Sequence, residues 1–134
     1  FKVLIANSVE CYTYVFGQET DGSSYVLFPY TPKHSAYCGV TGTRLFPRDY
    51  SMVADKVGSQ DQIAIVVSKK ELNFEDFNQR INRSNGNTYA AKLRDALGKE
   101  RSRQVEFKSS ANVAFEANTE SASAVGMVIE IPKQ

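Results

Sequence analysis

A histidine and a cysteine lie close together in the stretch His34-Ser35-Ala36-Tyr37-Cys38, and this pair could do chemistry. An imidazole that takes the proton of a neighbouring thiol is the minimum arrangement for nucleophilic catalysis. No motif typical of a catalytic cysteine surrounds Cys38, and nearness in sequence does not provide the geometry that catalysis needs. We therefore expect a protein without catalytic residues. A hydrolase-type enzyme that uses Cys38 and His34 is the alternative.

The chain contains two cysteines, Cys11 and Cys38, and one histidine. Structural zinc sites need four Cys or His ligands at characteristic spacings, so we expect no metal and no cofactor. A disulfide between Cys11 and Cys38 would indicate an oxidising compartment. Two buried free thiols are the other interpretation, because a free cysteine often serves as a small core residue. Both states of the pair stay open at this point.

The segment from Pro29 to Gly42 contains two prolines and two glycines and follows no regular period. Loops held by a rigid sheet are the usual places for binding residues. Exposed tyrosines in such a loop could stack on sugar rings or anchor a protein partner. The candidate binding residues of this segment and the strand after it are Tyr30, His34, Tyr37 and Arg44.

A pair of glycines ends this segment, in Gly39-Val40-Thr41-Gly42-Thr43-Arg44. Successive backbone amides in such a turn could cradle an anion, with Arg44 as the counter-charge. The stretch is not a P-loop, because it lacks the Gly-Lys-Ser/Thr ending and no long helix follows it. Tight turns explain the two glycines equally well.

The formal net charge of the chain is +1, so no global field recruits nucleic acid, and we expect none as a partner. Residues 69–103 hold nine basic and five acidic side chains, and this local excess could dock the segment on an anionic surface. The charges alternate in sign, which favours a solvated helical face instead. No apolar run in the sequence approaches the roughly 20 residues of a membrane helix, so we expect no transmembrane segment.

Most of the elements that would position these residues are β-strands. The runs Glu10–Phe16 and Tyr25–Phe28 flank Asp21-Gly22, and this is the strongest hairpin signal in the chain. Apolar residues at helical spacing begin at Leu72, and Asn73 is the expected N-cap of this first helix. A second helix is expected from about residue 88, and it ends at Gly98. Further strands are predicted at 1–6, 43–46, 50–54, 62–68, 105–107, 113–117 and 124–131.

Consecutive strands joined by short turns predict a mainly β fold of the α+β class. We expect an antiparallel β-sandwich or open barrel of about seven or eight strands. The length of 134 residues suits one domain, covering residues 1–134, with a helical pair inserted at about residues 73–98.

Several motifs of the first half resemble a bacterial family called DUF4384, and the helices and final strands resemble its Bacteroides-type version. The motifs are the strand end Tyr25-Val26-Leu27-Phe28-Pro29-Tyr30, the later Leu45-Phe46-Pro47, and the turn Gly58-Ser59-Gln60-Asp61 that leads into Ile63–Ser68. The matching stretch runs from about Val3 to Leu72.

The resemblance implies a non-catalytic, β-rich module attached to a larger envelope or signalling protein, beside other domains of the same polypeptide. We therefore expect an accessory module that binds a protein or glycan of the bacterial cell envelope, in the periplasm or at the outer membrane. No signal-peptide pattern is present in this chain. The resemblance supplies no catalytic residues, which agrees with the expectation drawn from the residues themselves.

Overall fold

A computed structural model of the chain describes residues 1–39, 42–109, 113–118 and 122–133. These residues form an α+β fold that is mainly β. The strands are β1 (Val3–Asn7), β2 (Cys11–Gln18), β3 (Ser24–Phe28), β4 (Tyr37–Cys38), β5 (Gly42–Phe46), β6 (Gln60–Ser68), β7 (Val105–Ser109), β8 (Val113–Ala117) and β9 (Ala124–Pro132). The helices are α1 (Phe74–Arg83) and α2 (Tyr89–Leu97), and the 3-10 turn η1 (Gly98–Glu100) follows α2.

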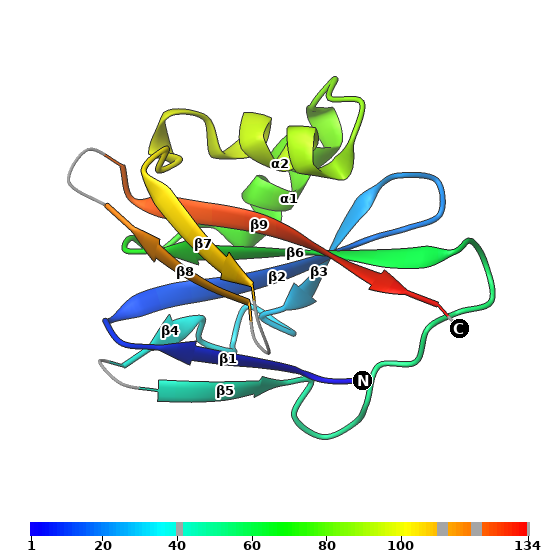
Figure 1. Cartoon of the computed structure of the whole chain (residues 1–134), viewed down its shortest axis with the longest axis horizontal. Coiled ribbons are helices and arrows are strands. Elements are labelled where there is room, and N and C mark those ends of the chain that lie inside the picture. Colours follow the sequence, from blue (N-terminus) through cyan, green and yellow to red (C-terminus); the bar gives the residue numbers. More distant parts are fainter. Residues whose placement is uncertain (40–41, 110–112, 119–121, 134) are drawn as a thin grey trace.

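The main body of the molecule has three layers (Figure 1). The middle layer is an antiparallel sheet with the strand order β3-β2-β6-β9, in which β4 also pairs with β2. The two helices cover one face of this sheet, and the antiparallel ribbon of β1 and β5 covers the other face. The predicted α+β sandwich of antiparallel strands is thereby confirmed.

Strand β2 is the centre of the sheet, because both of its edges are paired and both of its faces are covered. Strand β6 pairs along one edge. The other edge is shared, with β4 opposite Cys11 and Tyr12 and β3 opposite Val15–Gln18. Six of the eight residues of β2 are buried, so its alternating positions supply both cores. The ring of Phe16 meets Phe77 of α1, with 5.4 Å between the ring centroids.

Local capping chemistry sets the ends of both helices. The side chain of Asn73 accepts a hydrogen bond of 3.0 Å from the Asp76 amide at the start of α1. The hydroxyl of Thr88 does the same at the start of α2. Gly98 ends α2 with a φ of 54°, a region that favours glycine. The predicted N-cap of the first helix and the predicted end of the second helix are both confirmed.

The helical layer packs tightly on the sheet at Gly126 of β9. A Cβ atom at this position would lie 2.6 Å from Leu97 Cδ1 and 3.0 Å from Leu93 Cδ2. Both leucines belong to α2 and are buried. The missing side chain of Gly126 therefore makes the room in which α2 packs on the sheet.

Tyr89 connects α2 to strands β2 and β3 through its hydroxyl group. Its ring is buried, and its hydroxyl donates to the carbonyl oxygen of Gly17 over 3.2 Å. The same hydroxyl oxygen lies 2.9 Å from Ser24 Oγ at the start of β3. Burial raises the pKa of Tyr89 to about 12, because the charged phenolate is poorly solvated there.

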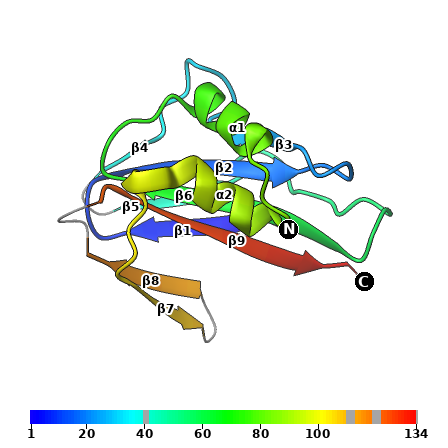
Figure 2. The same ribbon diagram turned by 90° about the horizontal axis from the view of Figure 1, so that it is seen from above.

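The β7–β8 hairpin lies to one side of the three layers (Figure 2). Its strands pair with each other, and Phe107 lies opposite Phe115 with 6.1 Å between the ring centroids. The start of β9 is tied to the chain just before the hairpin, because the Ser102 amide donates to the Ala124 carbonyl over 2.7 Å.

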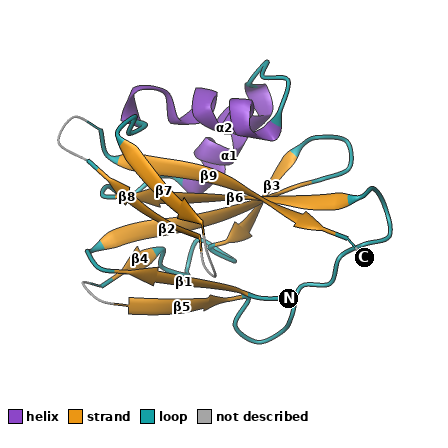
Figure 3. Ribbon diagram, viewed as in Figure 1, coloured by secondary structure: helices purple, strands orange, loops and turns teal. Residues whose placement is uncertain are grey.

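Two sequence expectations differ from the structure. Residues 50–54, predicted as a strand, run as a loop between β5 and β6 (Figure 3). This loop is held by other means: the amino group of Phe1 donates to the Met52 carbonyl, and Lys133 pairs with Asp55 and Asp61. Strand β4, by contrast, lies in the segment predicted to be irregular.

A valine at Gly126 should destabilise the fold by about 1–3 kcal/mol, because its methyl groups would push α2 off the sheet. The measurement is the free energy of unfolding in urea. The matched control is Gly39→Val, since a Cβ at Gly39 meets no atom within 4 Å. Equal stabilities for the two variants would contradict the packing described for Gly126.

The pKa of Tyr89 predicts a loss of stability in alkali. An unfolded tyrosine loses its proton near pH 10, whereas folded Tyr89 keeps it to about pH 12. Between these values the folded state binds more protons, so the free energy of unfolding falls as pH rises. In urea titrations, Tyr89→Phe should be less stable at neutral pH by roughly 1 kcal/mol and should show a shallower alkaline slope. Exposed Tyr50, as Tyr50→Phe, is the control that should keep the wild-type stability at neutral pH.

Candidate binding surface

The two Leu-Phe-Pro strand ends come together in space. Strands β3 and β5 end at Phe28 and Phe46, and each is followed by a cis proline bond. The two phenylalanine rings meet edge to face, with 6.0 Å between their centroids. The ring of Tyr30 stacks on Phe46 at 5.9 Å and meets Phe28 at 5.4 Å. The repeated tripeptide thus builds one aromatic cluster beneath the loop that follows β3.

Arg44 of β5 holds this loop in place. Its guanidinium lies over the ring of Phe28, 4.8 Å from the centroid. The same group donates to the carbonyl oxygens of Ser35 over 3.0 Å and of Tyr37 over 2.8 Å. The side chain is half-buried. Arg44 is therefore a positioning residue, whose planar group meets a ring and two carbonyls at once.

Tyr30 and His34 form the first exposed part of the loop. Their rings meet nearly at right angles, with 5.2 Å between the centroids. His34 Nδ1 lies 2.9 Å from the Thr31 hydroxyl, and the Arg48 amide donates to the Tyr30 hydroxyl over 3.2 Å. Tyr30 keeps 40% of its surface exposed. Both rings are thus oriented by neighbours and still open to a partner.

Tyr37 of β4 forms the second exposed part. Its hydroxyl donates to Glu10 Oε1 over 2.6 Å, and its ring meets Tyr12 of β2 at 5.6 Å. The hydrogen bond to Glu10 raises the pKa of Tyr37, because the phenolate form cannot donate it. Tyr37 keeps 42% of its surface exposed. We call Glu10, Tyr30, His34 and Tyr37 the loop surface.

The structure gathers all four sequence-predicted binding residues around one loop. Three of them, Tyr30, His34 and Tyr37, are exposed, whereas Arg44 lies behind the loop. Sequence reasoning missed Glu10, which precedes β2 and reaches the loop surface only because β4 pairs with β2. The signal that could have found it is that pairing, which joins residues far apart in the chain.

Cys38 and His34 have different surroundings. The sulfur of Cys38 is buried, 3.6 Å from Thr13 Oγ1 and 3.8 Å from the Ala36 carbonyl oxygen. His34 is exposed and contacts Thr31 and Tyr30. Cys11 lies beside Cys38, and both thiols are free in this structure. Burial raises the pKa of the Cys11 thiol, and the neighbouring Cys38 raises it further.

The sequence also predicts an anion-binding turn and a basic helical pair as sites. The predicted anion-binding turn includes Val40 and Thr41, which lie outside the described residues. Two cations of the helical pair interact with groups of the same molecule: Arg80 lies over the Phe77 ring at 4.9 Å, and Lys92 donates to the Gly22 carbonyl over 3.3 Å.

In the described part of the chain, no helix is both long and apolar enough to cross a bilayer. Over the same ranges, no three His, Cys, Asp or Glu side chains are arranged to hold a metal.

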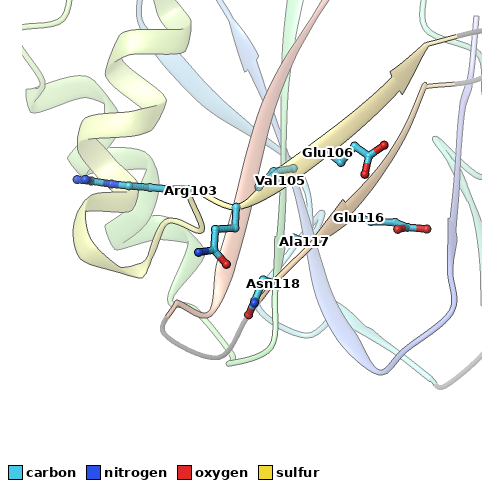
Figure 4. Close-up of a pocket in the computed structure, with 7 residues that line it drawn as sticks. Arg103, Val105, Glu106, Glu116, Ala117 and Asn118 are labelled. Carbon is cyan, nitrogen blue, oxygen red and sulfur yellow. The ribbon is translucent and has the colours of Figure 1, made fainter.

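A shallow hollow opens at the base of the β7–β8 hairpin (Figure 4). Glu106 and Glu116 lie opposite each other in the hairpin, and both side chains point away from Arg103. A cross-strand pair of carboxylates is repulsive when nothing lies between them. The lining residues of the hollow are Arg103, Gln104, Val105, Glu106, Glu116, Ala117 and Asn118.

Comparisons with known proteins give one match. The profile of DUF4384, described as a domain of unknown function, matches residues 1–71. That stretch contains β1 to β6 and more than half of the 134 residues. It agrees closely with the stretch indicated by the motifs of the first half. No curated protein and no solved structure matches the chain.

Replacement of Arg44 by lysine should destabilise the protein by about 1–2 kcal/mol, because an ammonium cannot serve two carbonyls and a ring face together. The urea midpoint, at an unchanged slope, is the measurement. Arg48→Lys is the matched control, since the Arg48 side chain is 86% exposed. If Arg44→Lys were as stable as Arg48→Lys, Arg44 would not position the loop.

Proposed function

The chain belongs to the DUF4384 family, a domain family of unknown function, and we propose that it is a non-catalytic binding module of a bacterial envelope or signalling protein. The partner is a protein or glycan of the cell envelope, and the module acts beside other domains of the same polypeptide. The observation that carries this proposal is the loop surface, where exposed aromatic rings rest on a firmly held backbone.

The loop surface has the composition of a recognition site. Tyr30 and Tyr37 offer large, partly apolar rings with polar tips, a combination enriched where proteins recognise partners. The polar side chains of Glu10, Lys33 and Arg48 are exposed in or next to this segment. An aromatic centre with a polar rim is typical of protein–protein interfaces, so a protein partner is favoured over a glycan.

Hydrogen bonds hold the backbone of the loop surface in the absence of a partner. Arg44 ties the carbonyls of Ser35 and Tyr37, and the Thr13 amide donates to the Ala36 carbonyl over 2.9 Å. Binding loses less affinity when the contact groups are held in place beforehand. A loop held by these hydrogen bonds presents its exposed rings in a defined arrangement, which suits recognition.

The two alternatives have less support. A hydrolase would need His34 to reach the Cys38 thiol, whereas His34 faces Tyr30 and the thiol faces Thr13. Docking on an anionic surface would need a concentrated basic face. The helical pair instead carries acidic side chains among its cations, as at Glu75 and Asp76 of α1.

A photo-crosslinking experiment tests the proposal. The chain, produced in its bacterial host, carries a benzophenone amino acid in place of Tyr37, and in a second variant in place of Phe107. Both side chains are exposed aromatics, 42% and 53% exposed, but Phe107 lies on the β7–β8 hairpin. We expect one defined crosslinked species from position 37 and not from position 107.

Alanine variants then measure the contribution of the ring. Tyr37→Ala should weaken binding of the identified partner by about tenfold or more, as expected for a central tyrosine. Its thermal stability should change little, because the lost contacts with Glu10 and Tyr12 lie at the surface. Phe107→Ala should leave binding unchanged. No crosslink at position 37, or equal binding by both alanine variants, would place the interface elsewhere.

A further inference from the structure

Cys11 and Cys38 are direct cross-strand neighbours in the β2–β4 pair. We propose that these two thiols form a reversible disulfide that clamps β4 onto β2 under oxidising conditions. Their side chains leave the sheet on the same face, because they occupy paired register positions. The state described here is the reduced form of this switch, with both thiols free.

The register sets the distance between the two cysteines. The Thr13 amide donates to the Ala36 carbonyl over 2.9 Å, so Thr13 and Ala36 are a hydrogen-bonded pair. The pattern alternates along antiparallel strands, which makes Cys11 and Cys38 the next hydrogen-bonded pair. The Cα atoms of such pairs are about 5.5 Å apart, within the range of roughly 4.4–6.8 Å that disulfides span. The bond can therefore form without separating the strands.

The Thr13 hydroxyl contacts both sulfurs. Its oxygen is 4.0 Å from Cys11 Sγ and 3.6 Å from Cys38 Sγ. Rotation of the two side chains toward each other would exchange these weak contacts for a covalent bond. Hydrogen-bonded pairs hold the Cβ atoms wider apart than most disulfides prefer, which makes the bond easier to reduce and favours reversibility.

Access to the thiols requires local opening of β4. Both cysteines are buried, with 3% and 6% of their surfaces exposed. Strand β4 has two residues and, among the described strands, pairs with β2 alone. Short edge elements open at a lower free energy than the core does. Burial also raises the pKa of Cys11, so exchange should begin in the opened state, where the thiolate is better solvated.

The reaction is a thiol–disulfide exchange with a small disulfide such as oxidised glutathione. One cysteine thiolate attacks this disulfide, forms a mixed disulfide and releases one glutathione thiolate. The second cysteine thiolate attacks the protein sulfur of the mixed disulfide and releases the second glutathione. Two electrons pass from the cysteine pair to glutathione, and the two thiol protons end on the released glutathiones.

The clamp would act directly on the loop surface. Strand β4 carries Tyr37 beside Cys38, so a bond from Cys38 to Cys11 anchors the end of the loop to the central strand. This consequence for recognition rests on the proposed function, whereas the bond itself does not. Oxidation should raise the melting temperature by about 5 °C or more, since the crosslink restricts the unfolded chain.

The test counts thiols in the folded protein after incubation with oxidised glutathione. Acid quenching, unfolding and alkylation with iodoacetamide follow, and intact mass is measured. The wild type should be lighter than the fully reduced protein by two hydrogens and should carry no alkyl group. Cys11→Ser and Cys38→Ser are matched controls, which should each carry one alkyl group or one glutathione. Their melting temperatures should not respond to oxidation.

A second sample distinguishes two reasons for a missing disulfide: slow access of glutathione to the buried thiols, and a geometry that does not allow the bond. The reduced, unfolded protein is refolded in the same glutathione buffer and counted in the same way. A bond that forms on refolding and raises the melting temperature supports the proposal. Two alkyl groups or two glutathiones per chain in both samples would overturn it, as would an oxidised form that melts below the reduced form. The thiol count needs no binding partner. A missing disulfide is therefore distinguishable from a loop surface that binds no partner.

Discussion

The structure depends on burying strand β2 on both faces at once. Its alternating positions are apolar on either side, so a single covering layer would leave one set of side chains in water. The helices cover the face that carries Phe16, and the β1–β5 ribbon covers the opposite face. Each of these layers buries its own apolar stripe in the same contact, which is why neither needs to be stable alone.

The layers that cover β2 extend beyond the stretch that matches the family. The match ends at residue 71, before α1 and α2 and before β9. Without the helices, the face of β2 that carries Phe16 would be uncovered. Strand β9 pairs with β6 from Gln60 to Ser68, so its absence would leave a long apolar edge. The second half of the chain thus completes both the sheet and its core.

Much of the fold could be predicted because its elements carry local signals. Strand β6 is a short run of β-branched residues, and the helix caps Asn73 and Gly98 stand where capping chemistry requires them. The strand expected at 50–54 is wrong: Tyr50 and Val53 are exposed, and the backbone of Met52 is paired with that of the distant Phe1. Strand β4 is too short to show a period, and it exists because β2 offers it a free edge.

The candidate site, like the fold, could be predicted from the sequence only in part. The sequence by itself indicated tyrosines in a segment with prolines and glycines, and strand ends at Phe28 and Phe46, since these follow from residue type and local pattern. Only the tertiary structure decided that Arg44 lies behind the loop, that Glu10 joins the loop surface, and that Cys11 lies opposite Cys38. Those relations arise from pairing between strands distant in the chain, and such pairing is set by the whole core rather than by any local run of residues.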